Sequence, residues 1–513
     1  MGRVPDQAIS LGGSPITETD LVAVARHGAH VALSPASLEA LESARSYVEQ
    51  LAASATPSYG ISTGFGALAN RHIPLESRTQ LQRSLVRSHA ASSGRPVEDE
   101  VIRGMALLRL QTMATGRTGV RPDTAKAYAA LLNAGITPVV REYGSLGCSG
   151  DLAPLAHVAL AVMGEGTVVL EGIEMEAWEA LQHKGIQPQQ LAEKEGLALI
   201  NGTDGMLATL MLACHDLGRL LTLADVTAAM SLEALLGTDR TLADDLMALR
   251  PHPGQREAAA NMRRVLEGSP IVASHAGPED TRVQDAYSLR CAPQVAGAAR
   301  DTLAHARLVA GREAAAAIDN PVLLPDGRIE SNGNFHGAPV GYVLDFLAIA
   351  VADLASISER RTDRMLDKSR SFGLPPFLAD DPGVDSGLMI AQYTQAGIVS
   401  ELKRLAAPAS VDSIPSSAMQ EDHVSMGWSA GRKLRTALDG LSRVLAIEAL
   451  TAARALQLRT PLRPAPATAA AVDAIGHAPG TDRFLSPDIE RTVDLVQSGA
   501  LLAAVEAVTG GLA

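Results

Sequence analysis

The sequence predicts a mainly α-helical protein, in which a bundle of long helices follows a smaller, mixed N-terminal part. Two observations support this fold class. The chain is rich in Ala and Leu but only 3% aromatic, a composition that suits packed helices better than a β-sandwich. Long apolar patterns with helical spacing also fill the C-terminal part, whereas the N-terminal part mixes short helical stretches with glycine-rich loops.

Two segments show the helical spacing most clearly. In each, apolar residues recur three or four positions apart, which gives one apolar stripe along a helix. The first stripe is Val343, Phe346, Leu347, Ala350, Leu354 and Ile357, and the second is Leu434, Leu438, Leu441, Leu445, Ala449 and Ala452. We expect several such helices, some exceeding about 25 residues, which imply a bundle. Apolar faces left over on such helices suggest that subunits associate through them.

The N-terminal part, residues 1–215, mixes short helices with three turn-dense segments, SYGISTGFGALAN, EYGSLGCSGD and LINGTDGM. A β-branched patch at Thr167–Leu170, followed by EGIEME, predicts a small hairpin. The helical part covers residues 216–513. Because no Pro/Ser-rich linker separates the two parts, we expect one integrated unit.

The charge balance limits the possible partners. With 44 basic and 57 acidic residues the net charge is −13, so the chain repels nucleic acid and anionic lipid. Neither is an expected partner. An anionic group on a substrate must therefore be held by a local cation.

The thiols and the apolar segments point to the cytoplasm. Cys148, Cys214 and Cys291 fit neither a disulfide framework nor a zinc pattern, so we expect reduced thiols. The opening MGRVPDQAISLGGS lacks the features of a secretory signal. The apolar window PVGYVLDFLAIAVADLASI carries Asp345 and Asp353, which favours a buried helix of a soluble protein over a membrane span.

The segment REYGSLGCSGDLAPLAHVALAVMG predicts a glycine-spaced loop that runs into a helix, with Asp151 as N-cap and Pro154 in the first turn. Three interpretations compete. The loop is an ordinary turn, or Ser149 or Cys148 is a nucleophile with helix amides as oxyanion hole. In the third, the Gly150 nitrogen attacks the Cys148 carbonyl carbon, and loss of water from this ring and from Ser149 leaves a methylidene-imidazolone. GCSGD does not match the G-x-S-x-G elbow of serine hydrolases.

The string GSLGCSGDLAPLAH resembles the signature of the aromatic amino acid ammonia-lyases. Further strings of that family follow in its order, among them YGISTGFG, QRSLVRSHA, EGLALINGTDG, QDAYSLRCAPQVAG, SNGNFHGAPV and SGLMIAQYTQA. The resemblance implies that Cys148-Ser149-Gly150 forms a 4-methylidene-imidazol-5-one autocatalytically, with no external cofactor. Glycine at 150 removes the Cβ that would crowd ring closure, and Ser149 supplies a hydroxyl that leaves as water. Cys148 stands where many relatives have Ala.

The same resemblance assigns roles to three more residues. Tyr59 in SYGISTGFG matches the catalytic tyrosine that takes the β-proton, although a lone tyrosine in a turn is more often a packing residue. Asn201 in INGTDG matches the asparagine that hydrogen-bonds the prosthetic group and the substrate; an Asn-Gly pair is otherwise a common turn. Phe335 in GNFHG matches a pocket phenylalanine, where a core position is the alternative.

Gln284, Tyr287 and Arg290 in QDAYSLR follow one another at spacings of three, which places them on one arc of a predicted helix. Such a polar arc could be a solvated face. The resemblance instead implies that they line the pocket, with Tyr287 among the catalytic groups. Arg290 would then hold the substrate carboxylate, for which its planar fork is suited.

Two positions imply the substrate. Ser88-His89 after RSLVR and Glu421 in QEDHVSM resemble the family members that act on L-histidine, and a carboxylate can accept from an imidazole N–H but not from a phenyl ring. Met419 stands where many relatives have Asn. Glu421, Asp422 and His423 are adjacent and would point apart on a helix, so we expect no metal site. The implied reaction gives trans-urocanate and ammonia, the first step of histidine degradation.

Three alternatives remain open at the level of sequence. The chain could act on tyrosine or phenylalanine, or as an aminomutase, on the same scaffold. It could be a serine or cysteine hydrolase, or an inactive helical scaffold. The resemblance further implies a cytoplasmic homotetramer whose active sites are shared between subunits.

Overall fold

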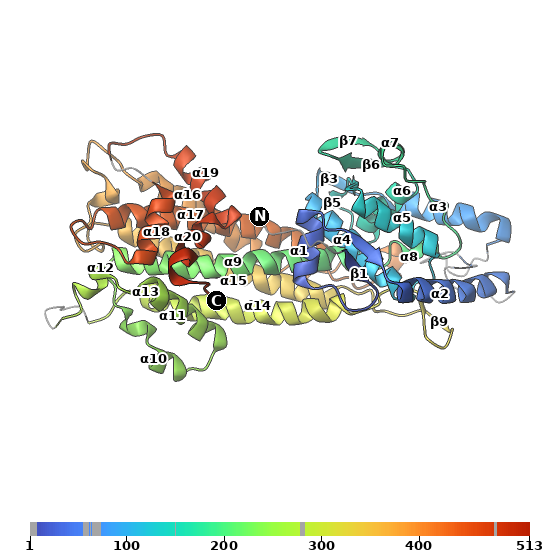
Figure 1. The fold of residues 1–513 in the computed structure, drawn as a ribbon, viewed down its shortest axis with the longest axis horizontal. Helices are drawn as coiled ribbons and strands as arrows, with labels where there is room; N and C mark the ends of the chain where they lie inside the picture. The colour runs from blue at the N-terminus through green and yellow to red at the C-terminus, as the bar shows by residue number, and fades with distance from the viewer. Residues whose placement is uncertain are drawn as a thin grey trace. The chain divides into compact units, whose positions relative to one another are not determined.

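The computed structural model describes residues 8–54, 61, 63, 73–148, 150–277, 283–476 and 480–513 (Figure 1). Helices dominate these residues, so the mainly α-helical fold class is confirmed. Three helices exceed 25 residues, as predicted: α9 (Asp204–Ala234), α15 (Ala338–Leu366) and α17 (Gly427–Gln457), with 31, 29 and 31 residues. A fourth, α14 (Ala292–Ala314), has 23 residues.

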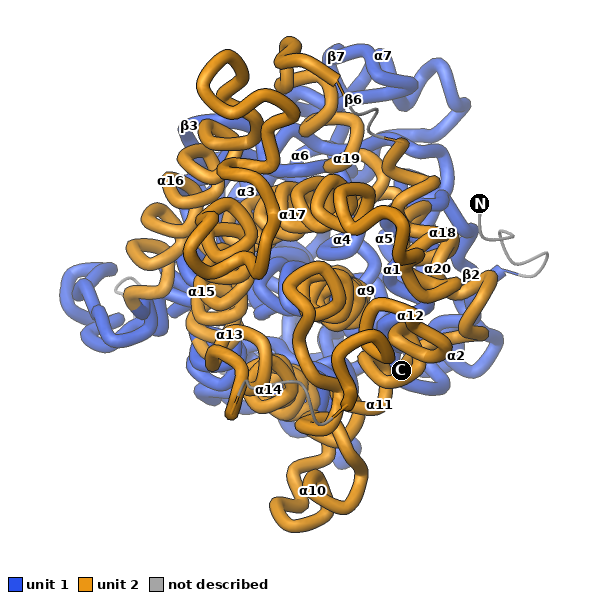
Figure 2. Tube along the Cα trace, turned by 90° about the vertical axis from the view of Figure 1, so that its left-hand side faces the viewer, with its two compact units in different colours: residues 1–212, 306–345, 408–432 blue, residues 213–305, 346–407, 433–513 orange. Residues whose placement is uncertain are grey.

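The chain divides into two compact units, coloured blue and orange in Figure 2. Unit 1 contains residues 1–212, 306–345 and 408–432, and unit 2 contains residues 213–305, 346–407 and 433–513. The first boundary lies close to residue 215, but two later segments return to unit 1. The division into consecutive parts 1–215 and 216–513 stays a prediction.

Unit 1 holds short helices and all of the strands. Its helices are α1 (Glu18–His27), α2 (Pro35–Ala53), α3 (Arg78–His89), α4 (Asp99–Ala114), α5 (Pro122–Asn133), α6 (Leu152–Val162), α7 (Ala177–His183) and α8 (Glu195–Ala198), with the 3-10 turns Leu75–Ser77 and Ser417–Met419. Its strands are β1 (Ile9–Leu11), β2 (Val31–Leu33), β3 (Ser93–Pro96), β4 (Thr137–Pro138), β5 (Arg141–Tyr143), β6 (Thr167–Leu170), β7 (Ile173–Glu176), β8 (Val322–Leu323) and β9 (Ile329–Glu330).

The strands form four small sheets. β1 and β2 pair in parallel, whereas β3–β5, β4–β6–β7 and β8–β9 are antiparallel. In the three-stranded sheet β4–β6–β7, Leu170 pairs with Ile173 and Thr167 with Glu176, so the predicted hairpin is confirmed.

Unit 2 contains the remaining helices. They are α10 (Asp244–Ala248), α11 (Pro253–Val265), α12 (Pro270–Ala273), α13 (Tyr287–Arg290), α16 (Met389–Leu405), α18 (Pro466–Ile475), α19 (Ser486–Ser498) and α20 (Ala500–Thr509), with the 3-10 turns Asp239–Leu242 and Pro376–Leu378. Four of the boundaries between the units fall inside α9, α14, α15 and α17, and the fifth follows the end of α16.

The two predicted apolar stripes have different outcomes. All six residues of the stripe on α17, from Leu434 to Ala452, are buried as predicted. On α15, however, Phe346 is 45% exposed while its neighbour Asp345 is buried, so the predicted stripe is wrong at this point. The reason is a polar contact, because the Asp345 carboxylate accepts a hydrogen bond from the Ser410 backbone N–H at 2.7 Å.

A buried carboxylate joins three helices within unit 2. Glu448 of α17 is fully buried and accepts hydrogen bonds from Thr227 and Ser231 of α9 and from Ser358 of α15. Arg361 of α15 adds an ion pair at 2.5 Å, with both side chains almost completely buried. This set satisfies the acceptor positions of a charge that would otherwise be costly to bury.

Two helices, α9 and α15, are long and apolar enough to cross a membrane by length and composition, and α19 with α20 would make a third if that bent pair counted as one span. Most of the apolar stretch is buried inside the protein, 78% in α9 and 61% in α15. Asp225 and Glu233 on α9 and Arg361 on α15 are buried with polar partners. Internal packing therefore covers most of the apolar surface of α9 and a smaller share of that of α15.

Candidate active site

The glycine-spaced loop before α6 is held by hydrogen bonds from other segments to its backbone carbonyl groups. The Gly147 carbonyl oxygen accepts from the Ser425 hydroxyl at 2.9 Å and from the Gly337 N–H at 3.1 Å. The Met426 N–H donates to the Leu146 carbonyl oxygen at 2.9 Å. The sequence segments around Phe335 and Glu421, both predicted to serve the site, therefore anchor this loop.

Asp151 occupies the N-cap position of α6, but its side chain does not cap the helix, so the predicted capping role is wrong. Its carboxylate instead accepts from the Ser145 hydroxyl at 2.9 Å and from the Met206 N–H at 2.8 Å. Complete burial raises the pKa of Asp151 to about 7. The residue thus ties the loop to the start of α9.

Gly150 has a backbone conformation and a packing that leave no room for a side chain. Its φ is +73°, and a Cβ at this position would lie 2.0 Å from the Gly202 carbonyl oxygen. Gly150 forms a parallel β-bridge with Gly202, so only glycine allows this close approach. Ser149 lies outside the described residues. The packing of residue 150 against Gly202 therefore requires the glycine that the predicted ring closure also needs.

Asn201 lies next to that bridge and is 3% exposed. Its Nδ2 donates to the Asn320 carbonyl oxygen at 3.2 Å, and its own carbonyl oxygen accepts from Arg109 at 2.5 Å. Its Oδ1 is buried and has no hydrogen-bond partner among the described residues. A buried acceptor of this kind is what a donor on a ligand or prosthetic group would satisfy.

Buried charges fix the surroundings of Asn201. Arg109 donates to the Ile318 carbonyl oxygen at 2.7 Å and lies 3.5 Å from the Asp204 carboxylate. Lys194 and Asp319 form a fully buried ion pair at 2.5 Å. Burial lowers the pKa of Lys194 and raises that of Asp319, and their mutual attraction opposes both shifts.

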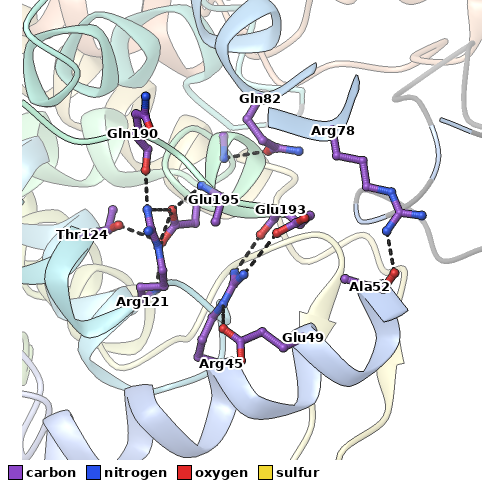
Figure 3. Close-up of polar contacts among 12 residues, drawn as sticks. Arg45, Glu49, Ala52, Arg78, Gln82, Arg121, Thr124, Gln190, Glu193 and Glu195 are labelled. Carbon is purple, nitrogen blue, oxygen red and sulfur yellow. Dashed lines mark hydrogen bonds and ion pairs between the residues drawn. The ribbon is translucent and has the colours of Figure 1, made fainter. Parts of the chain in front are cut away.

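The helix that leads to Asn201 is anchored by Glu195, as Figure 3 shows. This buried carboxylate accepts from the Arg121 side chain at 2.8 Å, from the Thr124 hydroxyl at 2.7 Å and from the Ala192 N–H at 2.7 Å. Gln82 of α3 accepts from the next backbone N–H, that of Gly196, at 2.8 Å. The short helix α8 is therefore fixed from both sides.

Glu421 contacts Cys148 in unit 1, and its charge reaches His89. The Cys148 Sγ donates to the Glu421 Oε2 at 3.0 Å. Burial lowers the pKa of His89, while a hydrogen bond to the Leu85 carbonyl oxygen and the nearby charge of Glu421 raise it. The His89 Nδ1 lies 2.8 Å from that carbonyl oxygen. Of the two residues that suggest histidine as substrate, Glu421 therefore contacts one flank of the predicted electrophile, and His89 lies within the electrostatic influence of Glu421.

Three further predicted residues lie in unit 2. Tyr287 and Arg290 are in α13, and the Arg290 guanidinium lies 4.6 Å from the centre of the Tyr287 ring. Gln284 precedes this four-residue helix, so the prediction of one helix that carries all three residues is wrong. Polar interactions fix this segment instead, since the Thr238 N–H donates to Asp285 at 2.8 Å.

The three predicted residues of unit 2 differ in their surroundings. Gln284 lines a cavity of about 160 Å³ together with Arg240, His275 and Asp285. Tyr287 is 70% exposed, and the Arg290 Nε is buried without a hydrogen-bond partner among the described residues. The Arg361 guanidinium donates to the Ser288 carbonyl oxygen at 3.3 Å, which links α13 to the buried Glu448.

The remaining predictions have simple outcomes. Phe335 is half-buried in the turn before α15. Tyr59 lies outside the described residues. No group of three or more potential metal ligands occurs within the described ranges. Ser416, whose hydroxyl donates to Glu421 at 2.7 Å, and Arg109 carried no signal in the sequence that would have identified them.

Comparisons with known proteins agree with this geometry. The family model of the aromatic amino acid lyases matches residues 16–477. A histidine ammonia-lyase of Streptomyces avermitilis is 64% identical over 510 residues, 98% of this chain and 99% of that protein. A histidine ammonia-lyase of Streptomyces griseus is also 64% identical, over 512 residues with the same coverage.

Solved structures share the fold. The crystal structure of histidine ammonia-lyase from Trypanosoma cruzi has a TM-score of 0.90 and 37% identity, covering 98% of this chain and 96% of that one. Tyrosine aminomutase from Streptomyces globisporus has a TM-score of 0.93 and 36% identity, covering 99% and 100%. Enzymes with different printed activities share this fold, so the fold alone does not distinguish their substrates. The family match covers residues 16–477 and therefore nearly the whole chain. This chain belongs to the aromatic amino acid lyase family.

Proposed function

We propose that this enzyme removes ammonia from L-histidine and releases trans-urocanate. The observation that carries the proposal is the contact between the Glu421 carboxylate and the Cys148 thiol, at 3.0 Å. It brings a group able to accept from an imidazole N–H to the edge of the tripeptide 148–150. The 64% identity to enzymes named histidine ammonia-lyase supports the same substrate.

The proposed prosthetic group is a 4-methylidene-imidazol-5-one made from Cys148, Ser149 and Gly150. It would supply an electron-poor methylidene carbon, which activates the amino acid for loss of ammonia. The glycine that ring closure needs is present at position 150, where the contact with Gly202 also excludes any side chain. The unpartnered Oδ1 of Asn201 supports a role in orienting the group or the substrate.

The chain's own residues would bind the substrate and move its proton. Arg290 would hold the carboxylate through its guanidinium, whose Nε still lacks a partner among the described residues. His89 and Glu421 would bind the imidazole. Tyr59 would remove the β-proton as general base, for which its pKa must fall below the ordinary phenol value of about 10. Tyr287, Gln284, Asn201 and Phe335 would orient the substrate.

We further propose a cytoplasmic homotetramer in which subunits share active sites. In unit 2, α15 and α16 expose Phe346, Ile349, Ile390 and Tyr393, by 45–61% of each side chain. Exposed apolar side chains on neighbouring turns favour association through these helices. Light scattering should give a mass near four times 53.4 kDa, and a monomer would reject this part of the proposal.

Product analysis tests the function. Purified enzyme is incubated separately with L-histidine, L-tyrosine and L-phenylalanine, and ammonia and the organic products are quantified. We expect urocanate and ammonia in equal amounts from histidine, and much slower turnover of the other two. A β-amino acid product, or no activity on histidine alongside activity on tyrosine, would instead favour an aminomutase or another lyase of the same fold.

A further inference from the structure

One oxygen of the Glu421 carboxylate receives two hydrogen bonds from different parts of unit 1. The Cys148 Sγ donates to Oε2 at 3.0 Å, and the Ser416 Oγ donates to the same atom at 2.7 Å. Cys148, the first residue of the tripeptide, is 8% exposed, so its thiol lies in the interior. Ser416 and Glu421 are half-buried. Two donors on one oxygen make the two oxygens of this carboxylate inequivalent.

The loop between these two residues is closed by its own backbone. The Ser416 N–H donates to the Glu421 carbonyl oxygen at 3.0 Å, and the Glu421 N–H donates to the Ser416 carbonyl oxygen at 3.3 Å. Between them Ser417, Ala418 and Met419 have φ values of 51°, 52° and 69°. Three consecutive non-glycine residues in the left-handed region are unfavourable and persist only where the surroundings hold them. The backbone of the loop therefore holds the Cα of Glu421 in one position.

The final torsion of a glutamate side chain is broad and does not orient the carboxylate plane by itself. Hydrogen bonds from Cys148 and Ser416 to one oxygen restrict that torsion before a substrate arrives. Restriction in advance removes an ordering cost that binding would otherwise carry. The carboxylate also stays at a fixed distance from residue 148, whose backbone belongs to the proposed prosthetic group.

We propose that Cys148 and Ser416 are positioning residues that fix the Glu421 carboxylate for a substrate that carries an imidazole. This inference rests on the proposed function. Both residues act through Glu421, so they set selectivity for the imidazole end of the substrate and leave the amino acid end unaffected. Cys148 gains a role for its side chain beyond the backbone atoms that it gives to the tripeptide.

The test compares Cys148→Ala and Ser416→Ala with the wild type. For each variant, KM and kcat are measured with L-histidine, and inhibition constants are measured for imidazole and for glycine as fragments of the two substrate ends. We expect KM and the imidazole inhibition constant to rise together by about three- to tenfold, equivalent to about 0.7–1.4 kcal/mol. In Ser416→Ala, which lies outside the tripeptide, turnover and the glycine inhibition constant should stay within about twofold, a change of about 0.4 kcal/mol or less.

Matched variants control for general damage. Ser417→Ala removes a hydroxyl from the next position of the same loop, and Cys214→Ala removes a buried thiol in α9. Both should retain wild-type KM. Ser416→Thr keeps the hydroxyl donor and should restore most of the affinity for imidazole. Circular dichroism and the mass of the peptide around residue 148 establish that each variant is folded and matured as the wild type is.

The outcomes separate this inference from the proposed function. An unchanged KM in both alanine variants overturns the inference, as does an equal rise of the imidazole and glycine constants, which indicates a general distortion. A lower kcat at unchanged KM also overturns it. Failure of the proposed function is detected separately, because the wild-type enzyme would then produce no urocanate from L-histidine.

Discussion

Gly150 and Gly202 pair through their backbones, and the N–H of the following Asp151 donates to the Gly202 carbonyl oxygen at 2.7 Å. This bridge joins the end of the predicted electrophile to the residue after Asn201. The two segments are about fifty positions apart in the sequence, yet the family resemblance assigns both to one site. The geometry of the pair explains why small residues occupy both positions.

Gly150→Ala should abolish activity. A Cβ at this position would lie 2.0 Å from a backbone oxygen of Gly202, so a side-chain rotation cannot relieve the contact. The φ of +73° adds strain for any residue with a side chain. We expect urocanate production to fall by at least about a hundredfold, corresponding to about 2.7 kcal/mol or more of lost transition-state stabilisation.

The control for this variant is Gly172→Ala. Gly172 has a similar φ of +81°, but no atom lies within 4 Å of a Cβ built there. This substitution should cost only the backbone strain, about 1–2 kcal/mol of stability, and leave activity intact. Wild-type activity in Gly150→Ala would show that the close approach of residues 150 and 202 is not required.

Glu448→Ala should destabilise the protein strongly. It leaves the Arg361 guanidinium buried without its carboxylate, a loss of roughly 3–5 kcal/mol for a buried pair. Urea unfolding followed by circular dichroism measures the change. Asp326→Ala is the control, because Asp326 and Arg328 are 54% and 62% exposed, and such a pair contributes about 0–1 kcal/mol. Equal effects of the two substitutions would contradict the account.

Asp151 should make stability depend on pH. Burial raises its pKa in the folded state from 3.8 to about 7, so the folded protein binds this proton more tightly than the unfolded chain. The free energy of unfolding should therefore decrease as pH rises from about 4 to about 7, and this contribution should be constant above that window. Asp151→Asn cannot titrate and lacks this dependence.

Thermal unfolding of both proteins between pH 5 and pH 8 isolates the effect. Lost hydrogen bonds in Asp151→Asn shift its midpoint by a similar amount at every pH, so only the pH trend of the difference matters. We expect the wild type to lose stability relative to the variant as pH rises. A constant difference would mean that Asp151 is ionised in the folded state throughout.

Arg109→Lys should lower turnover with little change in the amount of folded protein. The arginine fork donates to the Asn201 carbonyl oxygen at 2.5 Å and to the Ile318 carbonyl oxygen at 2.7 Å. A lysine keeps the charge but cannot span both acceptors with a planar fork. We expect kcat to fall about tenfold, or about 1.4 kcal/mol. Arg328→Lys at the exposed pair should have wild-type kinetics, and a tenfold loss there would point to a general effect of the exchange.

The sequence predicted those parts of the structure that a single local feature determines. The hairpin of Thr167–Leu170 and the buried stripe of α17 follow from β-branching and apolar spacing, and both are confirmed. The clustering of Cys148 with Glu421 was accessible only through the family resemblance, because no spacing rule connects residues so far apart.

The predictions that failed involve polar partners that the local sequence pattern does not reveal. Asp345 is buried on α15 because Ser410 supplies a donor, and Asp151 turns away from its cap because Ser145 and Met206 offer better contacts. The left-handed run from Ser417 to Met419 contains no glycine and gives no turn signal. The burial of Asp345 and the orientation of the Asp151 side chain depend on contacts that no local pattern encodes.

The mass of the peptide that contains residues 148–150 tests the central claim most directly. Active enzyme is digested under mild conditions and the peptide is measured by mass spectrometry. The account predicts a mass lower by two molecules of water than the unmodified sequence requires. An unmodified peptide in enzyme that actively produces urocanate would contradict it.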